Sequence, residues 1–296
     1  MNPLILTYAL NGLLMIAMPL GLAIFFARRW KLGWRVWWIG FATFILSQMG
    51  HIPFNALVSR WLNATGMVYW PPLAQAIFSA VFLGLSAGVF EEGARYLVLR
   101  YWARDARSWR KGILFGAGHG GSEAIIFGGL ALLGFVNMLI ARSMDLATLV
   151  PADQLALAQQ QVAAYWSAPW YATLLGAVER VFAIACHVFM ATLVMRAFTH
   201  RKIGWLFAAI GFHALLDAVA VFCQPYVSAY VLEAIVGVFA VLSILLTLRL
   251  RDPEPQPDPS TTPGAGSDPV FTPAEAPLLK PMEETPENLD NSRYQP

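Results

Sequence analysis

The sequence has little charge and very little cysteine. Charged residues make up 13% of its 296 positions, whereas 57% are hydrophobic. This proportion is too apolar for a water-soluble domain of this length, and it indicates a membrane protein. The two cysteines, Cys186 and Cys223, both lie in apolar runs, so neither a disulfide framework nor a zinc knuckle is expected.

Signatures of several protease classes are also absent. The chain has no paired intramembrane aspartates of the Gly-x-Gly-Asp type and no His-Glu-x-x-His zinc motif, and no serine nucleophile elbow is expected. Local sequence patterns therefore favour none of the aspartyl, standard zinc and serine protease mechanisms.

Charge is divided unevenly along the chain. Residues 252–296 hold nine of the eighteen acidic residues, only two of the twenty basic ones, and eleven of the nineteen prolines. Such a segment cannot form a packed core. We therefore predict a transmembrane domain over 1–251 and a disordered, acidic cytoplasmic tail over 252–296, whose partner the sequence does not identify. Nothing in the chain predicts binding to nucleic acid.

The predicted fold is all-α, a polytopic membrane protein with about seven transmembrane helices. A helix needs about 20 predominantly apolar residues to cross a bilayer, and seven stretches reach that length. The connection over 142–169 is predicted to hold a further helix on the membrane surface. The seven stretches are 4–27, 36–58, 73–102, 112–141, 170–198, 204–223 and 228–248.

Basic residues concentrate in alternate connections between these stretches. By the positive-inside rule, this bias places the N-terminus outside and the C-terminus in the cytoplasm. We expect an integral protein of a bacterial plasma membrane. The basic connections contain Arg28, Arg29, Lys31, Arg35, Arg104, Arg107, Arg110, Lys111, Arg201, Lys202, Arg249 and Arg251, against Arg60 and Arg142 in the others.

A small set of ionisable residues interrupts the apolar stretches. Such groups are costly in hydrocarbon unless they are paired or hydrated, so each needs a reason. Glu179 and Arg180 lie nearer the outer face, and we predict that they are structural, with partners elsewhere. The others are Glu91, Glu92, Arg95, His119, Glu123, His187, His213 and Asp217, with His51 and Glu233 left unassigned.

Four of these residues lie at one predicted depth. Counting about 1.5 Å per helical residue, they lie roughly 10–17 Å from the cytoplasmic ends of their segments. Because the segments alternate in direction, one carboxylate and three imidazoles reach the same level, which we interpret as a functional polar site. The four are Glu91, His119, His187 and His213.

Spacing within each helix indicates further neighbours. Residues three or four positions apart share a helix face, and an acid beside a histidine fixes the tautomer and orientation of the imidazole. Gly112, Gly116 and Gly120 recur every four residues, which predicts close helix packing around His119. The pairs with this spacing are Glu91–Arg95, Glu92–Arg95, His119–Glu123 and His213–Asp217.

A carboxylate and several histidines in a hydrated membrane cavity suit hydrolysis. The carboxylate takes a proton from water as general base, and a histidine orients that water or protonates the leaving amine. A further imidazole stabilises the developing oxyanion.

At these residues the chain resembles the CPBP and PrsW superfamily of glutamic-type intramembrane proteases, which includes the eukaryotic CAAX prenyl endopeptidases. Glu-Glu-x-x-Arg is present at 91–95, Phe-x-x-x-His at 115–119 and His-x-x-x-Asp at 213–217. The seven-span layout, with HGGSEAI and later HALLDA, is most similar to the YhfC branch. The resemblance covers roughly residues 5–250.

The resemblance implies an endopeptidase that acts on a membrane protein or peptide near the cytoplasmic side of the bilayer and requires no cofactor. It implies Glu91 as the base that activates water, with His119 beside it. It also implies His213 and Asp217 as the pair on the oxyanion side. Spacing alone does not distinguish Glu91 from Glu92 as the base.

Other positions extend the family pattern or depart from it. Arg95 would orient the two acids. Asp217 stands where the prenyl-protease branch usually has Asn, and an ionised Asp would disfavour an oxyanion, so Asp217 would need a proton or would only orient His213. Glu123 and His187 fall outside the shared pattern and are additional site candidates.

Two alternatives remain open. In the first, the peptidase binds zinc through His119, His187 and His213, with Glu91 or Glu123 as a fourth ligand. In the second, the carboxylates and histidines form the relay of a proton-coupled transporter or channel, which needs a polar path to both faces. The sequence identifies neither the substrate and its cleavage site nor the oligomeric state.

Overall fold

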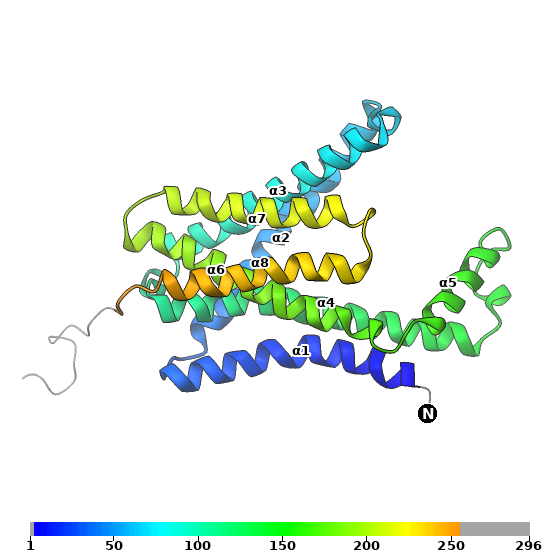
Figure 1. Ribbon diagram of the computed structural model, residues 1–296, viewed down its shortest axis with the longest axis horizontal. Helices are drawn as coiled ribbons and strands as arrows, with labels where there is room; N and C mark the ends of the chain where they lie inside the picture. The colour runs from blue at the N-terminus through cyan, green and yellow to red at the C-terminus, as the bar shows by residue number, and fades with distance from the viewer. Residues whose placement is uncertain (1–2, 255–296) are drawn as a thin grey trace, which may run out of the picture. The chain divides into compact units, whose positions relative to one another are not determined.

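The computed structural model describes residues 3–254, which form helices and turns without a β-strand (Figure 1). The predicted all-α fold is therefore confirmed, while the predicted tail beyond residue 254 lies outside the described residues. The α-helices of this part are α1 (Pro3–Trp30), α2 (Arg35–Ala64), α3 (Pro72–Tyr101), α4 (Trp109–Ser143), α5 (Leu155–Ser167), α6 (Leu175–Thr199), α7 (Gly204–Cys223) and α8 (Ala229–Arg249).

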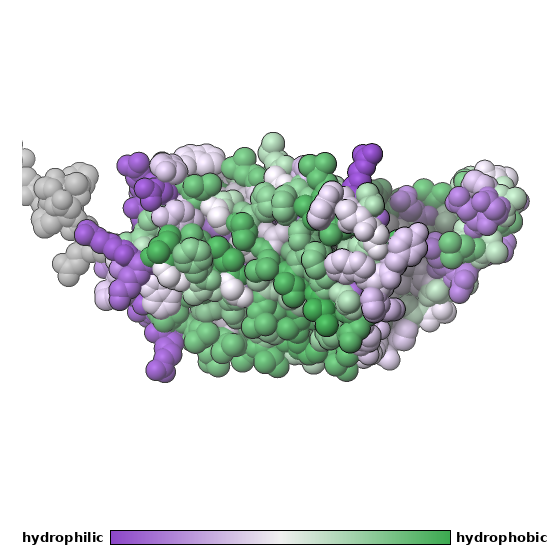
Figure 2. Space-filling model, turned by 90° about the horizontal axis from the view of Figure 1, so that it is seen from above, coloured by the Kyte–Doolittle hydropathy of each residue, from purple (hydrophilic) through white to green (hydrophobic). Residues whose placement is uncertain are grey.

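Six of these helices are long and apolar enough to cross a membrane, namely α1, α3, α4, α6, α7 and α8. The chain is an integral membrane protein. Helix α2 coincides with the predicted span at 36–58 and has 30 residues, but it is not among the six. Its crossing therefore stays a prediction, as does the orientation of the chain. Figure 2 shows a mainly hydrophobic surface along the middle of the bundle.

The helices that carry the ionisable residues pack against one another. Helix α4 is central, because it contacts α1, α2 and α6, while α3 packs mainly on α7 and α6 also packs on α8. A Cβ atom at Gly116 would lie 2.7 Å from Cα of Val188, and one at Gly120 would lie 2.9 Å from the side chain of His187. The predicted glycine-mediated packing of α4 is thus confirmed, and it brings α4 onto α6.

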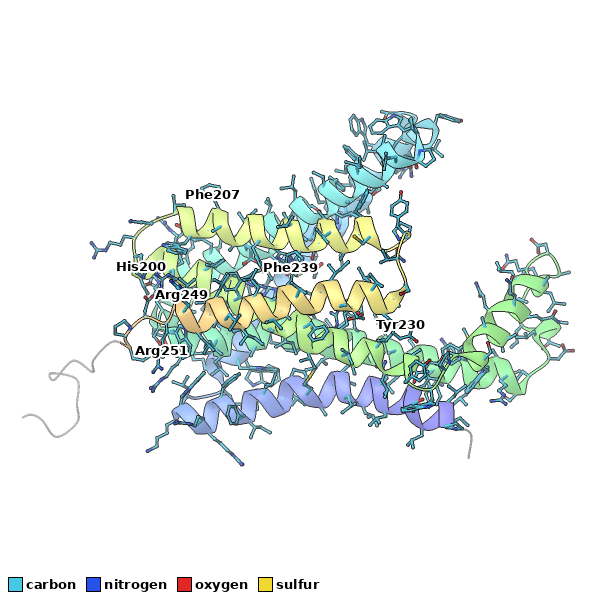
Figure 3. The ribbon with its side chains drawn as sticks, viewed as in Figure 1. His200, Phe207, Tyr230, Phe239, Arg249 and Arg251 are labelled. Carbon is cyan, nitrogen blue, oxygen red and sulfur yellow. The ribbon has the colours of Figure 1, made fainter. Side chains whose placement is uncertain are left out.

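Apolar side chains fill the bundle on one side of the ionisable residues. In Figure 3 the corresponding end of the bundle carries the labels His200, Arg249 and Arg251. The cluster contains side chains that are at most 1% exposed, among them Leu99, Leu114, Phe115, Val194 and Met195.

Helix α5 confirms the helix expected in the 142–169 connection. It packs at the start of α1, where the hydroxyl of Tyr8 donates a 2.8 Å hydrogen bond to the carbonyl of Tyr165 and the two rings stack. The indole of Trp166 donates to the carbonyl of Met138 on α4. The position of α5 on a membrane surface remains a prediction.

The last described residues contact the end of the bundle that carries the basic connections. The guanidinium of Arg196 donates to the Asp252 carboxylate at 2.7 Å, and His200 lies 3.0 Å from the same carboxylate. The backbone N–H of Arg110 donates to the side chain of Glu254. The residues that follow α8 therefore contact the end of α6 and the start of α4.

The contact of α4 with α2 depends on Gly118, whose Cβ would overlap the backbone carbonyl of Trp37. We expect Gly118→Ala to lower the free energy of unfolding by roughly 1–3 kcal/mol, because the two backbones must separate. Unfolding in mixed detergent micelles measures this change. Gly129→Ala on the same helix is the matched control, since a Cβ there meets no atom within 4 Å. Equal effects of the two substitutions would contradict the close-packing account.

Candidate active site

The guanidinium of Arg95 lies at the centre of the ionisable residues. It is fully buried, and its Nη1 donates to both carboxylate oxygens of Glu92, at 2.6 and 2.8 Å. Its Nη2 donates to Nδ1 of His187 at 2.6 Å and lies 3.8 Å from Oε2 of Glu91. One arginine on α3 therefore joins both acids of its own helix to a histidine on α6.

Glu92 forms its hydrogen bonds with buried side chains of the protein interior. Its side chain is completely buried, and besides Arg95 it contacts Nδ1 of His213 at 2.8 Å. A buried carboxylate is stable only when it is paired and hydrogen-bonded, and both conditions are met here. Glu92 therefore connects α3 to α7, and each of its oxygens accepts at least one hydrogen bond.

Glu91 has a different environment. Its Oε1 accepts a 2.9 Å hydrogen bond from the amide of Gln48 on α2, and its Oε2 lies 3.0 Å from Nε2 of His119 on α4. The carboxylate also lines a cavity. The arrangement fixes the carboxylate in position while it remains open to a small molecule.

His187 uses both ring nitrogens. Because Arg95 donates to Nδ1, the ring proton is on Nε2, which donates to Glu123 at 2.7 Å. Arg180 in turn lies 3.0 Å from Glu123 and also contacts Glu179. Arg180 thus has a partner on another helix, as expected, but it also contacts its sequence neighbour Glu179, which was not expected.

The predicted pairing of His119 with Glu123 along α4 is also not observed. His119 contacts Glu91 on α3, and Glu123 contacts His187 on α6. Each side chain finds its partner across a helix interface instead of four residues along its own helix. The Nδ1 atom of His119 is buried and has no hydrogen-bond partner among the described residues.

His213 connects the interior pair to the cavity. Its Nδ1 contacts Glu92, while its Nε2 lies 3.5 Å from Asp217 and 4.0 Å from Oε2 of Glu91. The predicted contact of His213 with Asp217 is therefore observed. Asp217 is the more exposed of the two, with 37% of its side chain accessible.

A cavity of about 180 Å³ lies between these helices. This volume is large enough for several water molecules. The polar side chains that line it come from α3, α4, α6 and α7, so the four helices predicted to share one polar level do meet there, although α4 contributes Glu123 and not His119. They are Glu91, Glu123, Glu179, Arg180, His187, His213 and Asp217.

Sequence reasoning missed the contribution of α2. His51, which had no assignment, lies 3.3 Å from Oε1 of Gln48, so the amide that contacts Glu91 is itself held. Asn55 lies 2.9 Å and Ser86 3.1 Å from the other ring nitrogen of His51. The signal was available, because positions 48, 51 and 55 share one face of a helix.

The stretch Gly84–Gly88 carries the letters Gly-x-Ser-x-Gly, against the expectation of no such pattern. It lies inside α3, where Ser86 donates to the carbonyl of Leu83 three residues earlier. A nucleophile elbow needs a sharp turn between a strand and a helix. The expectation of no elbow therefore holds in the structure.

Three side chains have the geometry of a metal-binding group. Glu91, His119 and His187 each offer one donor atom, these atoms lie within 4.8 Å of one another, and all three residues are buried. This group differs from the predicted set of three histidines, because His213 is turned toward Glu92 and is not part of it.

Comparisons with known proteins were made against families, curated proteins and solved structures. The model of a family described as YhfC intramembrane metalloprotease matches residues 14–240. A relative described as "Uncharacterized membrane protein YhfC", from Bacillus subtilis (strain 168), is 32% identical over 250 residues, which cover 82% of this chain and 95% of the relative. No solved structure matches significantly.

The buried position of Arg95 generates a stability prediction. Arg95→Met leaves Glu92 in the interior without its cation, and we expect a loss of about 3–5 kcal/mol in the free energy of unfolding. Arg35→Met is the control, because its pair with Asp105 is more than half exposed and exposed pairs contribute about 0–1 kcal/mol. Unfolding in mixed micelles compares the two, and similar losses would contradict the central role of Arg95.

Proposed function

The chain belongs to the YhfC family of intramembrane metalloproteases, and we propose that it is an intramembrane peptidase in which Glu91 activates the attacking water. Membership of the family supports an intramembrane protease in general. The observation that carries the finer proposal is the contrast between Glu91 and Glu92. They are adjacent in sequence, but only Glu91 lines the cavity.

Glu91 and Glu92 have different surroundings, and we assign them different roles for that reason. Glu92 is completely buried, paired with Arg95 and bonded to His213, so it cannot reach a substrate without breaking the interior network. Glu91 is held at one oxygen by Gln48 and at the other by His119. We assign Glu91 as the general base and Glu92 as the partner that positions Arg95 and His213.

The chemistry follows from the atoms that face the cavity. A water beside Glu91 gives its proton to the carboxylate as its oxygen attacks the scissile carbonyl carbon. The carboxylic acid that forms then delivers this proton to the leaving nitrogen as the C–N bond breaks. His119 holds the Oε2 atom through its Nε2 hydrogen bond, so the carboxylate does not need to reorient between the steps.

His213 is the candidate for stabilising the tetrahedral intermediate. Its Nδ1 is fixed by Glu92, and its Nε2 is directed between Glu91 and Asp217. Because Nδ1–H donates to Glu92, a second proton on Nε2 makes the ring an imidazolium, whose Nε2–H is a donor at the edge of the cavity, where charge develops on the carbonyl oxygen. Asp217 lies 3.5 Å from this nitrogen and orients the ring. An ionised Asp at this position would disfavour an oxyanion, so we assign it no direct contact with the intermediate.

Zinc-dependent hydrolysis is the second candidate, and the group of Glu91, His119 and His187 supports it. One carboxylate and two imidazoles form a known donor set for catalytic zinc, and Nε2 of His119 already lies 3.0 Å from Oε2 of Glu91. His187 would have to release one of its two hydrogen bonds. When bound, the ion would polarise the scissile carbonyl as a Lewis acid. Under either candidate Glu92, Arg95 and His213 keep their positions.

Peptidase activity tests the assignment of Glu91. The purified full chain in detergent is incubated with transmembrane and lipidated peptides, and cleavage is read by mass spectrometry. We expect Glu91→Gln to lose roughly 10²–10⁴-fold in rate, because the base is removed while size and the Gln48 contact are kept. His213→Ala should also lose activity, whereas Asp153→Asn, in an exposed connection, should not. Full activity of Glu91→Gln would refute the assignment.

Metal content separates the two candidates. With Glu91 acting as a base, we expect cleavage to survive a strong chelator and zinc to be well below one ion per chain by elemental mass spectrometry. One zinc per chain, lost in His119→Ala and kept in His200→Ala, together with chelator-sensitive cleavage, would establish the zinc mechanism instead. His200 is the control because it lies outside the network, beside Asp252.

A further inference from the structure

We propose that substrate and water reach Glu91 from the end of the bundle opposite to the basic connections. This inference rests on the proposed function, and it adds the side from which the scissile bond is presented. Three independent features of the described residues support it: the direction of the cavity, the position of the apolar core and the direction of the hydrogen-bonded chains.

The cavity extends from the network in one direction. On α6 it includes Glu179 and Ala183, which precede His187, and on α7 it includes Ala220, which follows His213. Helix α6 ends and α7 begins at the basic connection with Arg201 and Lys202. All three residues therefore lie on the side of the network that faces away from that connection.

The opposite direction is filled by the apolar core. On α3 Leu99 follows Glu91, and on α4 Leu114 and Phe115 precede His119, so they lie between the network and the basic connection of 102–111. On α6, Met195 occupies the same interval. These side chains are at most 1% exposed, so they leave no room for a peptide or a file of water at this end.

Two hydrogen-bonded chains leave the network in the same direction as the cavity. One runs from His187 through Glu123 to Arg180. The other runs from Glu91 through Gln48 to His51.

The α2 chain leads toward a second cavity of about 310 Å³, between the end of α2 and the start of α3. Ser59 and Asn63 on α2 and Gln75 and Ser79 on α3 contribute to its lining. Polar side chains in a membrane-spanning interface are stable where they meet one another or water. Because α2 begins and α3 ends at basic connections, this cavity lies at the opposite end of both helices.

The side of the membrane from which the site is reached determines the class of substrate. If the positive-inside prediction holds, the site opens to the outer side, although it lies nearer to the cytoplasmic ends of its helices. The substrate class is then a membrane-anchored polypeptide or peptide whose scissile segment enters from the outer half of the bilayer. The sequence predicted a site near the cytoplasmic side, and the proposed route reaches that site from the other side.

Thiol labelling tests the route without any need for turnover. In a full-length variant with Cys186→Ala and Cys223→Ala, single cysteines are introduced and treated with a small, membrane-impermeant cationic thiosulfonate. Right-side-out and inside-out vesicles are compared. Arg104→Cys reports the basic side and Asp145→Cys the opposite side, so the result does not depend on an assumed orientation.

We expect Ala220→Cys and Ala183→Cys, in the cavity, to react only in the vesicles in which Asp145→Cys reacts. Ala209→Cys, in the apolar core and fully buried, is the matched control on α7 and should react in neither preparation. Reaction of the cavity cysteines from the basic side, from both sides or from neither side would overturn the proposal. Failure of the peptidase assay alone would leave this result unaffected.

Discussion

The structure depends on the burial of one guanidinium among acids and imidazoles. Arg95 has no exposed surface, so its charge must be balanced and its N–H groups must find acceptors inside the protein. Glu92 provides the balance, His187 accepts from Nη2, and Glu91 lies beside it, while Nε has no hydrogen-bond partner among the described residues. Helices α3 and α6 are thereby fixed together, and His213 on α7 is fixed through Glu92.

Sequence patterns predicted the level at which these residues meet, and the chain's apolar segments and motif order predicted the fold and the family. They could not predict most pairings between helices. Spacing along a helix specifies only which residues share a face, so His119 and Glu123 appeared as a pair. In the structure each has its partner on a facing helix. Gln48 carried no charge and belonged to no motif, although it holds Glu91.

The packing of the helices determines the route into the site, and the distribution of charge along the sequence does not reveal that packing. The basic connections and the apolar core lie at the same end, and the sequence predicted that the reaction takes place near that end. The side chains of Leu114 and Phe115 occupy that interval, and the cavity lies beyond the network. The route of entry could be inferred only from the direction of the cavity between the packed helices.

The central claim is that Glu91, and not its neighbour Glu92, is the reactive carboxylate. Modification by the apolar carbodiimide dicyclohexylcarbodiimide, mapped by mass spectrometry of peptide fragments, tests it most directly, since the reagent couples to carboxyl groups that it can reach. The account predicts a stable adduct on Glu91 with Glu92 unmodified, as the cavity exposes only the former. An adduct on Glu92 with Glu91 unmodified would contradict it.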